Sequence, residues 1–208
     1  MLRIDHVVYA VRDLDEAAER FRREHGLDST PGGRHPGWGT ANRIVPLGDD
    51  NYIEFIAVVD ESVASGTWIG RAVREHVDAG RGWLAICASA DDLDQVARRL
   101  ELEVTSGVRE RPDGTELRWR SAGLEDSRRE PSMPFFISWE GPPGAHPGRG
   151  RAGHGVRVEG IARIDVEANE DAQRSWLGGN ELPIRVTNPG ARVVSVALAT
   201  RDGELVIS

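Results

Sequence analysis

The sequence has no lysine. All 26 basic residues are arginines, they are spread along the chain, and 34 acidic residues outnumber them, which leaves a net charge of −8. Exclusive use of arginine is typical of GC-rich coding and does not by itself indicate phosphate recognition. Because the chain is acidic and has no basic stripe, we expect no nucleic-acid partner.

Cysteine is almost absent as well. Cys87 stands alone, so no intrachain disulfide can form, and nothing in the composition requires an oxidising compartment. It lies within an apolar run, which predicts an inert buried thiol rather than a nucleophile.

Long hydrophobic runs are also missing. No apolar segment approaches the roughly 18–20 residues that span a bilayer. The first residues, MLRIDHVVYAVRD, do not combine a basic region with a long apolar stretch as a signal peptide does. We therefore expect a cytoplasmic protein without a membrane partner, and 208 residues suffice for a substantial core.

A stretch that occurs twice is the most informative pattern. Residues 6–21 read HVVYAVRDLDEAAERF, and residues 85–100 read AICASADDLDQVARRL. Each copy is an apolar run, then Asp-Leu-Asp with a capping box, then an amphipathic segment, which predicts a strand followed by a helix. His6 in the first copy corresponds to Ala85 in the second, so any chemistry at His6 is not duplicated.

Apolar runs separated by turn residues predict three further strands after each helix. This gives an α+β protein built from paired βαβββ modules, whose expected strands are 4–11, 29–35, 40–47, 52–59, 83–88, 103–110, 116–122 and 134–139. A hairpin turn is expected at residues 48–51 and a mobile polar loop at 121–131. The expected organisation is a first module (1–60), a connecting helix (61–81), a second module (82–140), a Gly/Pro linker (141–155) and a β-rich extension (156–208).

The extension leaves two interpretations open. Its pattern predicts a strand, a helix and three more strands, at 156–166, 170–177, 183–187, 192–199 and 204–207. It is either a third, degraded βαβββ module or an addition that closes a sheet edge. Edge strands left by this uneven segment favour a homodimer.

Two strands of the first module carry candidate acid–base groups. Glu54 is a charged residue within the otherwise apolar strand Tyr52-Ile53-Glu54-Phe55-Ile56, and a carboxylate there needs a partner or a cavity. If the fourth strand lies beside the first, His6 and Glu54 come close. The pair could bind a divalent metal, act as a general base with its orienting group, or be a structural hydrogen bond.

Polar and aromatic side chains cluster in the glycine-rich stretch 32–42. His35, Thr40 and Asn42 supply polar groups and Trp38 a stacking face, which favours a loop that lines a ligand, although a glycine-rich hairpin needs no function. His146 in the linker could fold over the same cavity. Tryptophans on the predicted strands are expected in the core: Trp83, Trp119 and Trp139.

With these strands in place, the chain resembles the vicinal oxygen chelate superfamily, and more narrowly its glyoxalase-like domain branch. The resemblance covers about residues 3–148 and is carried by Ile4-Asp5-His6-Val7-Val8 with Asp13-Leu14, the stretch from Gly33 to Asn42, Tyr52-Ile53-Glu54-Phe55, and Pro134 to Trp139 followed by His146-Pro147. It implies paired modules that form cup-shaped mixed sheets, in many members around a divalent metal.

The resemblance places His6 and Glu54 at metal-ligand positions, but Ala85 and Ile137 or Ser138 cannot complete the set. Either His35 or His146 is the third ligand, a second chain contributes, or the metal has been lost. The metals that this chemistry implies are Mn, Fe, Ni and Zn.

The resemblance implies a small-molecule enzyme of lyase, isomerase or dioxygenase type. In it, Glu54 or His35 would move a proton and Trp38, Thr40 and Asn42 would bind the substrate. The alternative is a metal-free protein that binds or sequesters a small molecule on the same fold.

Overall fold

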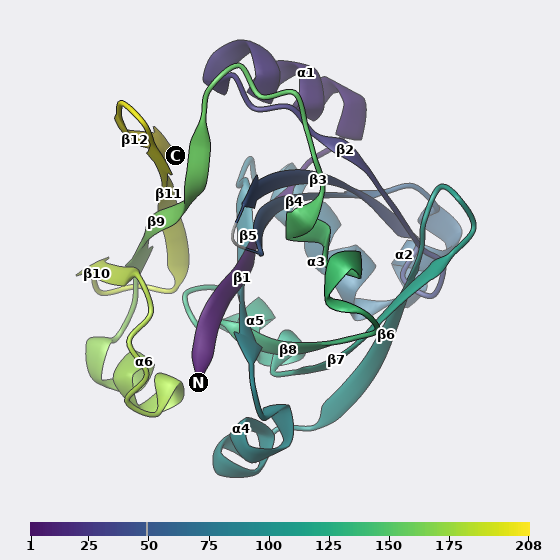
Figure 1. The fold of residues 1–208 in the computed structure, drawn as a ribbon. Helices are drawn as coiled ribbons and strands as arrows, with labels where there is room; N and C mark the ends of the chain where they lie inside the picture. The colour runs from purple at the N-terminus through teal and green to yellow at the C-terminus, as the bar shows by residue number, and fades with distance from the viewer. Residues whose placement is uncertain (49) are drawn as a thin grey trace.

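The computed structural model describes residues 1–48 and 50–208 (Figure 1). Asp49, in the expected turn at 48–51, lies outside the described residues. Eight strands form one closed barrel in the order β1-β4-β3-β2-β6-β7-β8-β5. Their bounds are β1 Leu2–Ala10, β2 Thr30–His35, β3 Thr40–Gly48, β4 Asn51–Val58, β5 Trp83–Ala90, β6 Val104–Glu110, β7 Glu116–Ala122 and β8 Phe135–Glu140.

The barrel consists of the two predicted βαβββ modules. In each module the first and fourth strands are parallel neighbours, β1 with β4 and β5 with β8. The modules join where β1 pairs antiparallel with β5 and where β2 meets β6. The sequence led us to expect cup-shaped sheets, whereas in the structure both modules share a single closed sheet.

Helices pack outside the barrel or at its open end. Their bounds are α1 Leu14–His25, α2 Glu61–Gly66, α3 Trp68–Asp78, α4 Leu93–Leu100, α5 Leu124–Arg129 and α6 Glu170–Leu177. The duplicated aspartates begin α1 and α4 as predicted, since Asp13 accepts from the backbone N–H of Glu16 and Asp92 from that of Gln95. The expected connecting helix at 61–81 is two helices, α2 and α3, and the expected loop at 121–131 is wrong because α5 occupies much of it.

The C-terminal extension forms a sheet of its own beside the barrel (Figure 1). It contains β9 Val158–Glu167, β10 Ile184–Asn188, β11 Arg192–Thr200 and β12 Gly203–Ile207, in the order β10-β9-β11-β12. The element order repeats βαβββ, but β9 pairs with β10 and β11 rather than with the fourth strand. The extension does not close a barrel edge, because the eight barrel strands close on themselves.

Successive side chains of β1 point to opposite faces of the sheet and belong to two different hydrophobic cores. Val7 packs outside the barrel in one cluster with Phe55 and with Ile164 and Leu198 of the C-terminal sheet. Val8 points into the barrel, in a second cluster with residues of β4, β5, β7 and β8. Among the described residues, no helix is long and apolar enough to cross a membrane.

Candidate functional site

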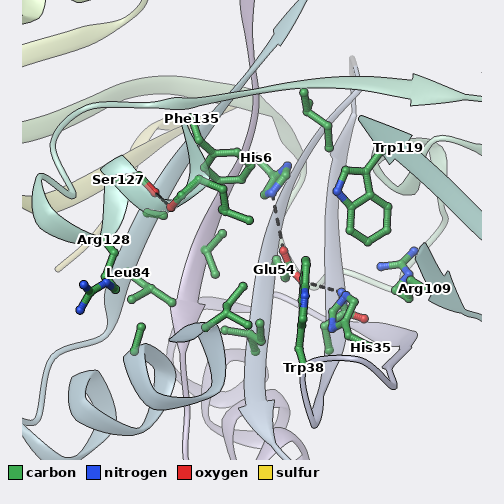
Figure 2. A pocket seen from close by; sticks show the side chains of 18 of the residues that line it. His6, His35, Trp38, Glu54, Leu84, Arg109, Trp119, Ser127, Arg128 and Phe135 are labelled. Atoms are coloured by element: carbon green, nitrogen blue, oxygen red, sulfur yellow. Dashed lines mark hydrogen bonds and ion pairs between the residues drawn. The ribbon is translucent and has the colours of Figure 1, made fainter. Parts of the chain in front are cut away.

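A pocket opens inside the barrel, between its inner wall and helices α3 and α5 (Figure 2). Polar groups come from β1, β2, β3, β4, β6 and α5, and the rest of the wall is mostly aromatic and aliphatic. Its lining residues are His6, Val8, His35, Trp38, Asn42, Tyr52, Glu54, Ile56, Trp68, Ile69, Ala72, Leu84, Ala85, Arg109, Trp119, Leu124, Ser127, Arg128, Phe135, Ile137 and Trp139.

His6 and Glu54 meet in this pocket, as the sequence predicted. The parallel register of β1 and β4 sets Val8 opposite Glu54, and His6 Nε2 lies 3.6 Å from Glu54 Oε2. This separation is longer than a hydrogen bond, so both atoms remain available to a third group. The His6 ring stacks on Tyr52 with centroids 4.4 Å apart, which fixes its plane.

A buried carboxylate holds the other side of His6. Asp5 Oδ1 lies 2.7 Å from His6 Nδ1, while Asp5 Oδ2 accepts a 2.9 Å bond from Trp139 Nε1 and lies 3.1 Å from His146 Nε2. Burial opposes ionisation of Asp5, but the hydrogen bonds from His146 and His6 outweigh it and lower the pKa to about 2. Asp5 therefore stays ionised and favours the tautomer in which Nδ1 carries the His6 proton.

Asn42 holds the second oxygen of Glu54. Its Nδ2 donates a 2.5 Å hydrogen bond to Glu54 Oε1, and its own Oδ1 is buried with no partner among the described residues. Gly32 makes this packing possible, because a Cβ there would lie 2.2 Å from Asn42 Oδ1. The Glu54 side chain is 12% exposed, so this clamped carboxylate is reached from the pocket.

His35 lies in the same pocket as the His6–Glu54 pair, and the negative charge of Glu54 acts on it through space. Its Nδ1 is 3.0 Å from Thr40 Oγ1, and its ring is 4.9 Å from that of Trp38. Complete burial lowers the pKa of His35 to about 4, so the imidazole is uncharged at neutral pH. Thr40 is buried beside His35 and does not line the pocket, so its contact with a substrate remains a prediction.

Neither candidate for the third metal ligand forms a compact set of three with His6 and Glu54. His146 lies against Asp5, and neither it nor His35 joins His6 and Glu54 in a set of ligand atoms within 4.8 Å of one another. Within residues 1–48 and 50–208, the one such set is Asp5, His6 and Cys87, all buried, which could hold a metal ion. Cys87 is a buried thiol as the sequence predicted, but its place beside His6 was not expected and follows from the antiparallel pairing of β1 and β5.

The chemistry of the donors separates these two metal sites. Metal bonds to nitrogen and oxygen are about 2.0–2.2 Å long, so His6 Nε2 and Glu54 Oε2, at 3.6 Å, can both reach one ion. The Asp5–His6 contact of 2.7 Å is already a hydrogen bond, and burial raises the pKa of the Cys87 thiol well above its usual value. The residues thus fit an ion better at the His6–Glu54 pair, where two protein ligands are present.

Other lining residues were not foreseen from the sequence. Trp83 and Trp119 are buried in the outer and inner clusters as expected, but Trp119 also lines the pocket, and so does the partly buried Trp139. Arg109 was not recognised at all. Glycines are the local signals for this wall, because a Cβ at Gly107 would lie 2.2 Å from the Trp119 ring and a Cβ at Gly33 would lie 2.9 Å from Arg109 Cγ.

Comparison with known proteins identifies relatives of this fold. Residues 4–181 match the family model described as "Glyoxalase-like domain". A hypothetical protein from Staphylococcus aureus is similar over 99% of this chain and 84% of its own, with 18% identity and a TM-score of 0.66, so the shared fold includes the C-terminal sheet.

A looser similarity involves methylmalonyl-CoA epimerase from Mycobacterium tuberculosis. It has 22% identity and a TM-score of 0.48, over 68% of this chain and 89% of that one. No curated protein matches the chain.

Proposed function

The chain belongs to the glyoxalase-like domain family, and from this premise and the geometry of the pocket we propose that it is an enzyme of isomerase or lyase type. In this proposal Glu54 moves a proton on a small molecule bound inside the barrel. The observation that carries it is the Glu54 carboxylate, with one oxygen held by Asn42 and the other facing His6 across 3.6 Å.

The pocket suits Glu54 to proton transfer. A general base must reach the proton that it removes, and Glu54 is the carboxylate among the lining residues. Its Oε2 would take a proton from a carbon next to a carbonyl, while the C–H electron pair forms the enolate. Return of that proton to the same or a neighbouring carbon completes an isomerisation, and loss of a neighbouring group completes an elimination.

The surrounding residues orient this carboxylate and the enolate. Asn42 fixes the rotamer of Glu54, and Asp5 fixes the ring of His6. His35 is uncharged above about pH 4, so it can hydrogen-bond a developing oxyanion without bringing a charge that would pair with Glu54 beforehand. Glu54 Oε2 serves as the base where no ion is bound to it; a divalent ion held by His6 Nε2 and Glu54 Oε2 would occupy that oxygen and would instead supply polarisation of the substrate carbonyl.

The donors do not favour the dioxygenase alternative. Oxygen-activating non-haem iron sites need two histidines and one carboxylate on one face. Among the described residues, Glu54 belongs to no group of three with histidine, cysteine or carboxylate atoms within 4.8 Å. We therefore favour proton transfer over oxygenation as the reaction of this pocket.

A metal-free binding protein is the second candidate. A chain of ring contacts runs along the wall, from His35 to Trp38 at 4.9 Å, to Trp119 at 6.0 Å and to Trp139 at 5.7 Å between centroids. Such a wall can hold a planar ligand without any chemistry.

Hydrogen–deuterium exchange at carbon tests the proposal without knowledge of the product. Pyruvate, phenylpyruvate and hydroxyacetone are incubated with the protein in D₂O, with and without Mn²⁺ or Zn²⁺, and the C–H signals are followed by proton NMR. We expect wild type to accelerate exchange of at least one compound, and Glu54→Gln to lose about 10²-fold or more of that rate. Glu103→Gln, at an exposed position outside the pocket, is the matched control.

Two results would overturn the assignment of Glu54. One is exchange no faster than in protein-free solution for all three compounds. The other is a Glu54→Gln rate equal to that of Glu103→Gln. Ligand binding without exchange would favour the binding protein.

A further inference from the structure

An arginine is buried in the pocket without a counter-charge in contact with it. Arg109 on β6 is 5% exposed, and its Nε is buried with no hydrogen-bond partner among the described residues. Burial lowers the pKa of Arg109, and the neighbouring Tyr52 and Glu54 act in the opposite direction only through space. An arginine side chain keeps its proton in proteins, so a positive charge stands in a largely apolar wall.

Glu54 does not neutralise this charge by contact. Its Oε1 is taken by Asn42 and its Oε2 faces His6, and the ion pairs of 4.0 Å or less within residues 1–48 and 50–208 do not include Arg109. A buried charge without a partner is costly, because the lost hydration is not replaced. Because no described residue replaces the lost hydration of Arg109, a bound anionic group is needed to do so.

A glycine leaves the space that the Arg109 side chain fills. Gly32 lies against it, and a Cβ on Gly32 would come within 3.1 Å of Arg109 Nη1 as well as 2.2 Å from Asn42 Oδ1. Both side chains thus depend on the missing Cβ. Figure 2 shows the Arg109 side chain on the same side of the pocket as Trp119 and His35.

We propose that Arg109 binds the oxyanion of the ligand, a carboxylate or a phosphate, and that the pocket takes a small anion with a planar apolar body. The guanidinium fork matches two oxygens of such a group, and the rings of Trp38 and Trp119, which meet edge to face with their centroids 6.0 Å apart, supply an aromatic wall for the apolar part. This inference rests on the pocket being the site of the proposed function, and it names the class of substrate that Glu54 would act on.

Binding of three matched probes tests the proposal without any turnover. Benzoate, phenyl phosphate and the neutral benzamide are titrated at pH 7.5 against tryptophan fluorescence and, independently, by calorimetry. For wild type we expect benzoate or phenyl phosphate to bind at least tenfold more tightly than benzamide. The tighter of the two anions shows whether carboxylate or phosphate fits better.

Substitutions assign the preference to one side chain. Arg109→Met removes the charge with similar volume and should abolish the tenfold preference, while its melting temperature stays at or above that of wild type, because an unpaired buried charge is lost. Arg109→Lys keeps the charge without the fork and should bind the preferred anion at least threefold more weakly. Arg118→Met, at a 58% exposed side chain on β7, is the control and should keep the preference.

Three outcomes would overturn the role of Arg109: equal binding of benzamide and both anions by wild type, an unchanged preference in Arg109→Met, or, where that variant does not fold, wild-type binding by Arg109→Lys. Glu54→Gln separates this inference from the proposed function. A preference for anions that persists in Glu54→Gln supports oxyanion binding by Arg109, even if no hydrogen–deuterium exchange is found. Hydrogen–deuterium exchange without a preference for anions would refute oxyanion binding by Arg109 but not proton transfer by Glu54.

Discussion

Asn42 Nδ2 donates a 2.5 Å hydrogen bond to Glu54 Oε1 across the antiparallel pair β3–β4. The two residues are diagonal neighbours, because Asn42 stands opposite Ile56 and Glu54 opposite Ile44. This contact fixes one carboxylate oxygen and leaves the other facing His6.

Replacement of this amide by an acid should make stability depend on pH. In Asn42→Asp two carboxylates touch, so the folded pair retains one proton near neutral pH, whereas the unfolded chain releases both. Unfolding free energy should therefore fall as pH rises from 4.5 to 7.5, by about 1–3 kcal/mol relative to wild type. Urea denaturation at both pH values measures this. Asn42→Ala should lose similar stability at each pH, and an equal loss in Asn42→Asp would contradict the prediction.

His35 should destabilise the fold in mild acid. Because burial lowers its pKa from 6.5 to about 4, its contribution is complete above pH 6.5 and is lost as pH falls towards 4. The full shift corresponds to about 3 kcal/mol. Denaturation at pH 7.5, 5.5 and 4.5 should show that His35→Asn, which can keep the bond to Thr40, removes much of this loss.

The pH range above separates His35 from the buried carboxylate Asp5. Asp5, with a pKa of about 2, loses its contribution only as pH falls below its ordinary value of 3.8. His25→Gln, at a half-buried histidine on α1, is the comparison and should change the pH dependence much less. Parallel pH profiles for wild type and His35→Asn would refute the assignment.

Gly32 should tolerate no larger residue while Asn42 is present. A Cβ at Gly32 would lie 2.2 Å from Asn42 Oδ1, whereas a Cβ at Gly37 would meet nothing within 4 Å. We expect Gly32→Ala to cost about 1–3 kcal/mol and Gly37→Ala to be near neutral. In the double variant Gly32→Ala/Asn42→Ala part of the cost should vanish, since the clash has no partner. Additive losses in chemical denaturation would mean that the clash lies elsewhere.

Metal content should follow Glu54 rather than Cys87. After dialysis against Mn, Fe(II), Ni or Zn, elemental mass spectrometry should find metal in wild type and in Cys87→Ser, and little in Glu54→Gln or His6→Ala. The reason is that His6 Nε2 and Glu54 Oε2 both face the pocket, whereas Cys87 is fully buried. Metal lost in Cys87→Ser but kept in Glu54→Gln would instead place the ion at Asp5, His6 and Cys87.

The sequence predicted most elements because their signals are local. The bounds of the strand at 116–122 and of the helix at 170–177 match β7 and α6. Capping aspartates and apolar periodicity act within a few residues, so they survive whatever the tertiary arrangement. The short helix α5 was missed because it begins at a glycine without a side-chain cap and follows no long apolar stripe.

The candidate site was predicted only in its first module. His6 and Glu54 could be brought together because one rule, that the fourth strand lies beside the first, decides their distance. Arg109 could not be found in this way: along β6 the neighbouring Val108 is 38% exposed and Arg109 5% exposed, the reverse of what side-chain polarity indicates.

The sequence by itself therefore determined the two βαβββ modules, their duplicated helix starts and the pairing of His6 with Glu54. The tertiary structure decided the closure of eight strands into one barrel. This closure places three side chains of the second module in the wall of the pocket that also contains His6 and Glu54, namely Trp119, Trp139 and Arg109. The physical reason is that pairing between modules depends on contacts among residues far apart in the chain. These contacts cannot be predicted from the spacing or the polarity of residues that are neighbours in the sequence.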